Sequence, residues 1–314
     1  MQDRRVQRMV LLSLPAACVP GVSALAGNFN DKVLLGKKLF YDKISSPDSM
    51  ACAECHAPSV GFTGPNPGIN RHGAVYRGAV PQRFGNRKPP SSAYASYSPV
   101  FYYDALLGGF VGGNFWDGRA TGSHLGNPAA DQALGPFLNP VEQDNPSKLA
   151  VLEQVKKSKY AYLWQKAWDE PLSLDAAKID LNYDRIGLSI AAYEESAEVS
   201  PFSSKYDGYL GGTAELTSEE LRGLELFDGK ANCASCHDSE AGPNGEPPLF
   251  TDFSYDNLGV PKNPENPFYG TDRVYVNGQP INPEGAQWVD PGLGGFLSTT
   301  EWSSMATLSD GYAP

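Results

Sequence analysis

The sequence predicts a mainly α protein made of two similar units with long loops between their helices. One pattern carries this prediction: a stretch with helical spacing, a short loop and then Cys-x-x-Cys-His occurs near residue 50 and again near residue 235. The chain also contains 33 glycines and 26 prolines in 314 residues, without a repeat period, which indicates long ordered loops. Aromatic residues make up 11% of the chain, which argues against disorder.

Length and charge limit the class of protein. A chain of 314 residues has room for one large domain or two of ordinary size. It has 25 basic and 36 acidic residues, a net charge of −11, and no basic stretch stands out beyond the N-terminal tip. The composition therefore predicts no nucleic-acid partner.

The N-terminus is typical of a secretory signal peptide, which we place at residues 1–26. Three arginines within residues 1–8 precede an apolar run at 9–26, and Ala24-Leu25-Ala26 fits a cleavage site. The alternative is an uncleaved membrane anchor, but Pro15 and Pro20 interrupt the run. We expect a periplasmic protein whose mature form has no membrane span and a net charge of −13, since the segment carries three Arg and one Asp.

Four stretches have the apolar spacing of helices, and two of them share a pattern. The pattern is Gly-x-x-Leu-Phe, at Gly36–Phe40 and Gly223–Phe227, and a glycine there permits close crossing of another helix. Thr217 with Glu220 makes a capping box at the start of the last stretch. The expected helices are 32–41, 146–167, 174–197 and 217–227, with a linker at 200–213 and long, glycine- and proline-rich loops at 57–115 and 238–300.

The cysteines indicate the cofactor. Cys-x-x-Cys-His is the attachment motif of c-type haem, in which one helical turn places two thiols under the vinyl groups of one porphyrin and the histidine binds the iron. The Leu and Phe of the repeated pattern would cover that porphyrin. We therefore expect two cytochrome c-like haem domains, at 27–199 and 200–314, the second incomplete. The motif residues are Cys52, Cys55 and His56, and Cys233, Cys236 and His237.

Two other interpretations of the cysteines stay open at this point. A zinc site could take four thiolates, two from each pair, but it would not explain a histidine after both pairs. A disulfide framework is compatible with export, but two-residue loops make strained, redox-active disulfides, and no βαβ pattern accompanies them. Two covalent haems explain every residue of both motifs.

Three further motifs resemble the diheme cytochrome c peroxidases and their relative MauG. They are Phe-Trp-Asp-Gly-Arg-Ala at 115–120, Gln-Ala-Leu-Gly-Pro at 132–136 and Asn-Pro-Val-Glu at 139–142. The resemblance runs from about residue 30 to the end of the chain. The stretch 121–131 is longer than in the family, which affects the geometry expected between the haems.

The resemblance implies a peroxide site at the first haem. Such a site needs a carboxyl group over the iron to move a proton between the peroxide oxygens, and Glu142 matches the family's catalytic glutamate. Gln132 is expected to donate a hydrogen bond to peroxide or water, and Pro136 to line the distal pocket. The structural alternatives are a solvated or capping Glu142 and an exposed Gln132.

Two residues of the first motif are expected to serve electron transfer and haem binding. Trp116 resembles the tryptophan that lies between the haems of the family, where an indole can relay electrons; a plain core tryptophan is the alternative. Arg119 is expected to pair with a haem propionate. Tyr102 and Tyr103 are interface aromatics by position alone.

Three loop residues complete the candidates. His72 falls where many bacterial peroxidases carry a removable distal iron ligand, and the alternative is a surface histidine that never touches iron. Asn86 resembles the residue that lends a ligand to an inter-domain calcium ion. His124, in the longer stretch, is expected on the surface.

The second haem lacks an identified distal ligand. In the family it is a methionine in peroxidases and a tyrosine in MauG, beyond the position at which this sequence stops. Met305 lies too early in the pattern to be the expected ligand.

The function that these residues predict is a periplasmic diheme peroxidase that reduces hydrogen peroxide to water. Its expected electron donor is a small c-type cytochrome or cupredoxin, and the net charge favours a basic docking face on that donor. A homodimer is implied by the resemblance. The alternatives are a MauG-like oxidase that modifies a tyrosine or tryptophan of a partner protein, and a diheme electron carrier without a substrate.

Overall fold

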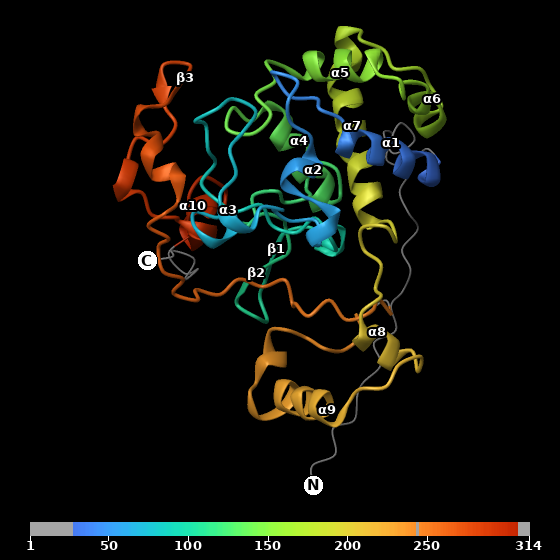
Figure 1. Cartoon of the computed structure of the whole chain (residues 1–314), viewed down its shortest axis with the longest axis vertical. Helices are drawn as coiled ribbons and strands as arrows, with labels where there is room; N and C mark the ends of the chain where they lie inside the picture. Colours follow the sequence, from blue (N-terminus) through green and yellow to red (C-terminus); the bar gives the residue numbers. More distant parts are fainter. Residues whose placement is uncertain (1–27, 243–244, 307–314) are drawn as a thin grey trace.

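The computed structural model describes residues 28–242 and 245–306, so the predicted signal peptide at 1–26 lies outside the described residues. Helices and loops dominate, and the strands in the described part form two short antiparallel hairpins, as expected for a mainly α chain (Figure 1). None of the helices in these two ranges is long and apolar enough to cross a membrane. The elements are α1 (Phe29–Tyr41), α2 (Cys52–Cys55), α3 (Pro67–Arg71), β1 (Tyr102–Asp104), β2 (Gly109–Val111), α4 (Pro128–Leu138), α5 (Lys148–Lys157), α6 (Tyr162–Trp168), α7 (Ile179–Glu195), α8 (Lys205–Leu210), α9 (Ser218–Glu225), β3 (Tyr275–Val276), β4 (Gln279–Pro280) and α10 (Gly292–Leu297).

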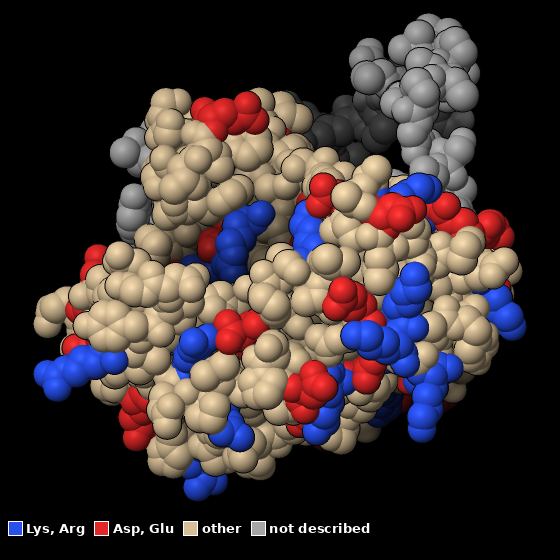
Figure 2. Space-filling model, turned by 90° about the horizontal axis from the view of Figure 1, so that it is seen from above, with Lys and Arg blue, Asp and Glu red and all other residues tan. Residues whose placement is uncertain are grey.

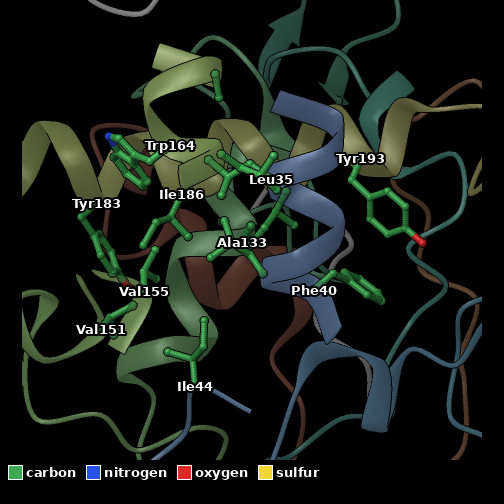
Figure 3. Close-up of a cluster of buried hydrophobic side chains, with 14 of the residues drawn as sticks. Leu35, Phe40, Ile44, Ala133, Val151, Val155, Trp164, Tyr183, Ile186 and Tyr193 are labelled. Atoms are coloured by element: carbon green, nitrogen blue, oxygen red, sulfur yellow. The ribbon is translucent and has the colours of Figure 1, made fainter. Parts of the chain in front are cut away.

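The main core surrounds α7, against which α1, α4 and α5 pack (Figure 3). Close approach depends on small residues at the crossings: a Cβ atom on Gly36 of α1 would lie 1.8 Å from the backbone oxygen of Ser189 of α7. Gly187 has the same role toward α4, where a Cβ would lie 2.6 Å from the Ala130 oxygen. The predicted use of Gly36 for a close helix crossing is therefore confirmed.

Polar side chains cap the starts of several helices. Asn28 caps α1 and Asn127 caps α4, each by accepting hydrogen bonds from two backbone N–H groups. Thr217 and Glu220 form the predicted capping box of α9. The helices expected at 32–41, 174–197 and 217–227 are confirmed with shifts at their ends.

Two local expectations were wrong. The single helix expected at 146–167 is two helices, α5 and α6, because Ser158 leaves the helical conformation and its hydroxyl donates to the Val155 oxygen at 2.7 Å. The segment 200–213, expected as a linker, contains α8, which the capping box of Ser204 and Asp207 starts.

The C-terminal part of the described chain packs against residues of the first half. Leu293 and Leu297 of α10 form a second core with Phe101 and Phe110, and the two phenylalanine rings stack with centroids 5.2 Å apart. In Figure 1, α8 and α9 lie at the opposite end of the molecule from α5 and α6. Residues on both sides of α8 and α9 in the sequence therefore contribute to the surroundings of the first Cys-x-x-Cys-His motif.

Candidate functional site

The first motif opens onto a cavity of about 530 Å³. Its two thiols belong to α2, a single helical turn, and the histidine follows as the C-cap residue. Cys52, Cys55 and His56 all line the cavity, as do Gln132, Pro136 and Glu142. The size lies within the range of cavities that hold small molecules and cofactors.

A backbone carbonyl orients the imidazole of His56. The Nδ1 atom of His56 lies 3.1 Å from the Phe62 carbonyl oxygen, so Nδ1 carries the proton and donates. Burial lowers the pKa of His56, against a smaller rise from hydrogen bonds to the Phe62 and Pro90 carbonyls. The ring is therefore neutral near pH 7 and keeps the Nε2 lone pair for a metal ion.

Helix α4 supplies one wall of the cavity. Gln132 and Pro136 are four residues apart, so they lie on the same face of the helix, and both line the cavity. Pro136 has no N–H, which leaves the Gln132 backbone carbonyl without its helical donor, and α4 ends two residues later. The structure therefore brings both predicted distal residues to the first motif.

Glu142 reaches the same cavity from the turn that follows α4. The Glu142 N–H donates to the Asn139 carbonyl at 3.0 Å, and the Gln143 N–H donates to the Pro136 carbonyl at 3.1 Å, which folds the turn back onto the helix. Burial raises the pKa of the Glu142 carboxyl, against smaller lowering by the charge of Arg119 and a hydrogen bond from Asn139. A carboxyl with a raised pKa is suited to give and take protons near neutral pH.

Trp116, Arg119 and Asn86 also line the cavity. Trp116 keeps 54% of its surface exposed, so it is a rim residue and not a plain core tryptophan. Arg119 lies over the Phe115 ring at 3.8 Å. The Asn86 carbonyl accepts a hydrogen bond from Asn266 at 2.9 Å, which ties the loop at 86 to the C-terminal segment.

Sequence reasoning missed the contribution of the C-terminal segment. Tyr269, Trp288 and Asp290 line the first cavity, together with residues 260–263 and Asn266. They carry no motif, and they reach the cavity through contacts with residues about 200 positions earlier. No local signal in the sequence indicates such pairings.

Several residues that line the cavity fit a haem. Gln143 is 3% exposed, and its Oε1 atom has no hydrogen-bond partner, although its Nε2 atom lies 3.8 Å from the Cys52 sulfur. The side chains of Arg77 and Lys88 line the cavity without an ion pair among the described residues. Two free cations match the two propionates of a haem, and an orphan buried acceptor indicates a further group or water in the cavity.

The other interpretations of the cysteines fit less well. All four described cysteines are free thiols, so neither pair is a disulfide. Burial raises the pKa of Cys52 and of Cys55 to about 12, the opposite of the shift that redox-active or metal-binding thiols need. Among the described residues, no three His, Cys, Asp or Glu side chains gather into a metal site, so the four thiols do not converge on a zinc ion.

Comparison with known proteins decides the family. Residues 30–215, more than half of the chain, match the family described as di-haem cytochrome c peroxidase. The chain belongs to this family. It is 35% identical over 237 residues to the methylamine utilization protein MauG of Paracoccus denitrificans, covering 73% of this chain and 57% of that protein. It is 31% identical over 244 residues to the cytochrome-c peroxidase IdrP2 of Denitromonas iodatirespirans, covering 77% and 54%.

A solved structure supports the same fold. The diheme peroxidase BthA of Burkholderia thailandensis superposes with a TM-score of 0.71 at 29% identity, covering 93% of this chain and 66% of that one. The chain spans somewhat more than half the length of the curated relatives it matches. The sequence resemblance to the di-haem peroxidases is therefore confirmed at the level of family.

The second motif of this di-haem family member has the same local geometry as the first, but it is exposed to solvent. The His237 Nδ1 atom lies 3.0 Å from the Phe250 carbonyl oxygen, the same arrangement as at the first motif. Cys236 and His237 are exposed, and so are Leu221 and Leu226 of the preceding helical stretch. An exposed apolar helix face beside the motif fits a porphyrin that would cover it.

The structure does not bring His72 to the cavity. Its side chain is 62% exposed, and its Nδ1 atom lies 3.2 Å from the Glu265 carboxylate. His124 is exposed, as expected, and pairs with Asp184 at 2.9 Å. Tyr102 and Tyr103 are exposed on β1, and Met305 packs at the edge of the second core and not beside either motif.

Proposed function

We propose that this chain reduces hydrogen peroxide to two waters with two electrons and two protons, at the first of two covalently bound haems. One observation carries the proposal: Glu142, Gln132 and Pro136 line the same cavity as the first Cys-x-x-Cys-His motif. An electron carrier needs no buried carboxyl over its iron, whereas peroxide cleavage does. The chain would act as an oxidoreductase of the cytochrome-c peroxidase type.

The residues at the two motifs would hold the cofactors. Cys52 and Cys55 would form the thioether bonds at the first haem and Cys233 and Cys236 at the second, with His56 and His237 as iron ligands. Arg119 would pair with a propionate of the first haem. The two haem-bearing units would divide near residue 200, although residues 260–290 complete the first cavity. The haem supplies an iron that binds peroxide and passes electrons.

The protein's own groups would move the protons. Glu142 in its ionised form would take a proton from the peroxide oxygen nearer the iron and return it to the outer oxygen as the O–O bond breaks. Because that proton already belongs to the peroxide, two further protons from solvent and the two electrons from the donor complete the two waters. Gln132 would donate a hydrogen bond that orients the peroxide, and Pro136 would keep that side of the cavity apolar.

Further features of the proposal concern partners and location. The donor would be a small c-type cytochrome or cupredoxin, with Trp116 relaying electrons between the haems. On the face shown in Figure 2, acidic and basic side chains are interspersed, so the negative net charge does not form one patch there. Export to the periplasm, a homodimer and a calcium ion at Asn86 belong to the same proposal.

The decisive experiment measures peroxide consumption by the holoprotein with a reduced small cytochrome c as donor. We expect turnover by the wild type and a loss of roughly 100-fold or more in Glu142→Gln, the range typical of a lost general acid–base. Glu54→Gln is the matched control, because Glu54 lies within the same motif, is exposed and does not line the cavity. If Glu142→Gln turns over at the wild-type rate, the proton-transfer role of Glu142 is wrong.

A MauG-like oxidase is the second candidate, favoured by the 35% identity to MauG. It would use peroxide to oxidise a tyrosine or tryptophan of a partner protein, and the half-exposed Trp116 at the cavity rim would offer a route for electrons from that partner. Peroxide consumption that does not depend on the small donor, with oxidised aromatic residues in an added protein, would favour this candidate over the peroxidase.

A further inference from the structure

Four charged side chains form a continuous chain beside the first cavity. Asp290 accepts two hydrogen bonds from Arg87, from Nε at 2.7 Å and from Nη2 at 2.5 Å. The Nη1 atom of the same guanidinium donates to Asp117 at 2.7 Å. Asp117 in turn accepts from Arg119 Nη1 through both of its oxygens, at 2.9 and 2.8 Å.

The inner members of the chain are shielded from water. The side chains of Asp117 and Arg87 are 11% and 18% exposed, and that of Asp290 is 23% exposed. Paired charges with this little exposure keep a fixed geometry, because a single removed partner leaves the other poorly solvated. Bidentate contact between Arg87 and Asp290 fixes the orientation of the guanidinium as well as its position.

Arg119 is the outer end of this row of ion pairs, and it lines the same cavity as Glu142. Its charge lowers the pKa of Glu142, although burial, the larger effect, raises that pKa. The side chain of Arg119 is 43% exposed, so it needs an anchor to stay over the cavity. Asp117 provides that anchor with one guanidinium nitrogen, and the other donors of Arg119 stay available for a haem propionate.

We propose that Asp117 is a positioning residue of the peroxide site: it holds the Arg119 guanidinium beside Glu142, and Arg87 and Asp290 hold Asp117. Through this row of ion pairs, Asp290 in the C-terminal segment contributes to setting the protonation of Glu142. This inference rests on the proposed function, because it assigns Asp117 to the same site.

The direction in which Asp117→Asn shifts the pKa of Glu142 distinguishes positioning of Arg119 from a direct effect of the Asp117 charge. If Asp117 acted on Glu142 only through its own negative charge, Asp117→Asn would lower the pKa of Glu142. If Asp117 positions Arg119, the same substitution releases the cation to solvent, and the pKa of Glu142 rises. The other groups that face Glu142 do not change in this comparison: Asn139 is neutral, and the Cys55 thiol becomes a non-titrating thioether when haem is attached.

The test titrates Glu142 directly in the holoprotein. The infrared C=O band of the protonated carboxyl is identified by its loss in Glu142→Gln, and its pH midpoint is followed in the other variants. We expect the midpoint to rise by roughly 0.5 to 1 pH unit in Asp117→Asn and in Arg119→Gln. Asp290→Asn should raise it less, because Arg87 keeps its bond to Asp117. A midpoint that stays or falls in Asp117→Asn overturns the proposal.

Asp144→Asn is the matched control. It breaks an ion pair with Arg83 at 2.8 Å, two residues from Glu142, without touching Arg119. We expect the pH midpoint of the Glu142 band to stay or fall in this variant. A rise equal to that in Asp117→Asn would show a non-specific loss of local structure and would overturn the proposal. If Asp117→Asn does not yield holoprotein, Asp290→Asn decides by the same sign, since it also removes a negative charge and a support of Arg119 through Arg87 and Asp117. The infrared band can be titrated without turnover. A wild-type protein that is inactive toward peroxide would therefore contradict the proposed function but not the positioning role of Asp117.

Discussion

The Nδ1 atom of His56 lies 3.1 Å from the backbone carbonyl oxygen of Phe62, and Phe62 has a φ of +59°. The second motif repeats both features, since His237 donates to Phe250, which has a φ of +55°. The intervening loops differ in length, so the shared element is the left-handed backbone that turns the carbonyl toward the ring. A phenylalanine pays steric strain there that a glycine would not.

The first prediction separates the role of the Phe62 backbone carbonyl from that of the Phe62 side chain. Phe62 is 6% exposed and packs edge-on against Phe40, so Phe62→Gly should lower the free energy of unfolding by about 3 kcal/mol or more. Glycine adopts a positive φ freely, so the carbonyl should stay on His56. Phe62→Val loses part of the same packing, but a β-branched residue resists that φ and should move the carbonyl. Resonance Raman of the reduced holoprotein should show a shifted iron–histidine stretch in Phe62→Val alone; equal shifts in both variants would contradict this.

The second prediction compares the glycines of the two Gly-x-x-Leu-Phe stretches. Gly36→Ala should cost about 3 kcal/mol or more of unfolding free energy, because the new Cβ would meet the Ser189 backbone at 1.8 Å. Gly223→Ala is the matched control: nothing lies within 4 Å of its Cβ position, so alanine should be neutral or stabilise α9 by up to about 1 kcal/mol. Thermal unfolding of both holoproteins measures the difference. Similar losses in both variants would mean that the two glycines have the same role.

These glycines show how far the sequence repeat extends. It predicted the position of both helices, because apolar spacing and capping residues are local signals. It also predicted a close crossing at both, which holds in the described chain for Gly36 and not for Gly223. A repeated pattern indicates the same element twice, whereas its packing depends on the partner that the rest of the chain supplies.

The residues of the candidate site also fall into two groups, those that local motifs predict and those that depend on long-range packing. Cys52, His56, Gln132 and Glu142 could be found because each belongs to a short motif whose spacing fixes local geometry. The C-terminal residues of the cavity wall could not, since their positions depend on pairings across about 200 residues, such as that of Asp290 with Arg87. Loop position also depends on such pairings, which is why the sequence left two alternatives for His72.

The third prediction concerns that histidine. The structure holds His72 at Glu265, outside the cavity, and the Asn263 side chain also donates to its backbone oxygen at 2.8 Å. His72→Ala should therefore leave the optical and EPR spectra of the oxidised holoprotein unchanged, and the exposed ion pair should contribute less than about 1 kcal/mol to stability. His124→Ala, which also removes an exposed histidine paired with a carboxylate, is the control. A low-spin iron that becomes high-spin in His72→Ala alone would restore the histidine as a distal ligand.

The fourth prediction concerns Glu194, another carboxyl on the wall of the first cavity. It is 4% exposed, and burial raises its pKa to about 8, against a smaller lowering by the Ser92 hydroxyl. In the unfolded chain its pKa is about 4.3. Between these two values the folded state holds a proton that the unfolded state has released, so the free energy of unfolding falls by up to about 1.4 kcal/mol per pH unit as pH rises, and levels off above pH 8.

Glu194→Gln should remove this slope, because an amide fills the same space without a charge. The variant should match the wild type near pH 5 and exceed it by a few kcal/mol near pH 8, measured by denaturant unfolding of the holoprotein at both values. Glu195→Gln, the same change on the exposed neighbouring residue, should leave the pH dependence of the wild type intact. If Glu194→Gln keeps the wild-type slope, a cation or a hydrogen-bond donor stabilises the ionised carboxylate in the haem-loaded protein, and the carboxyl is charged at neutral pH.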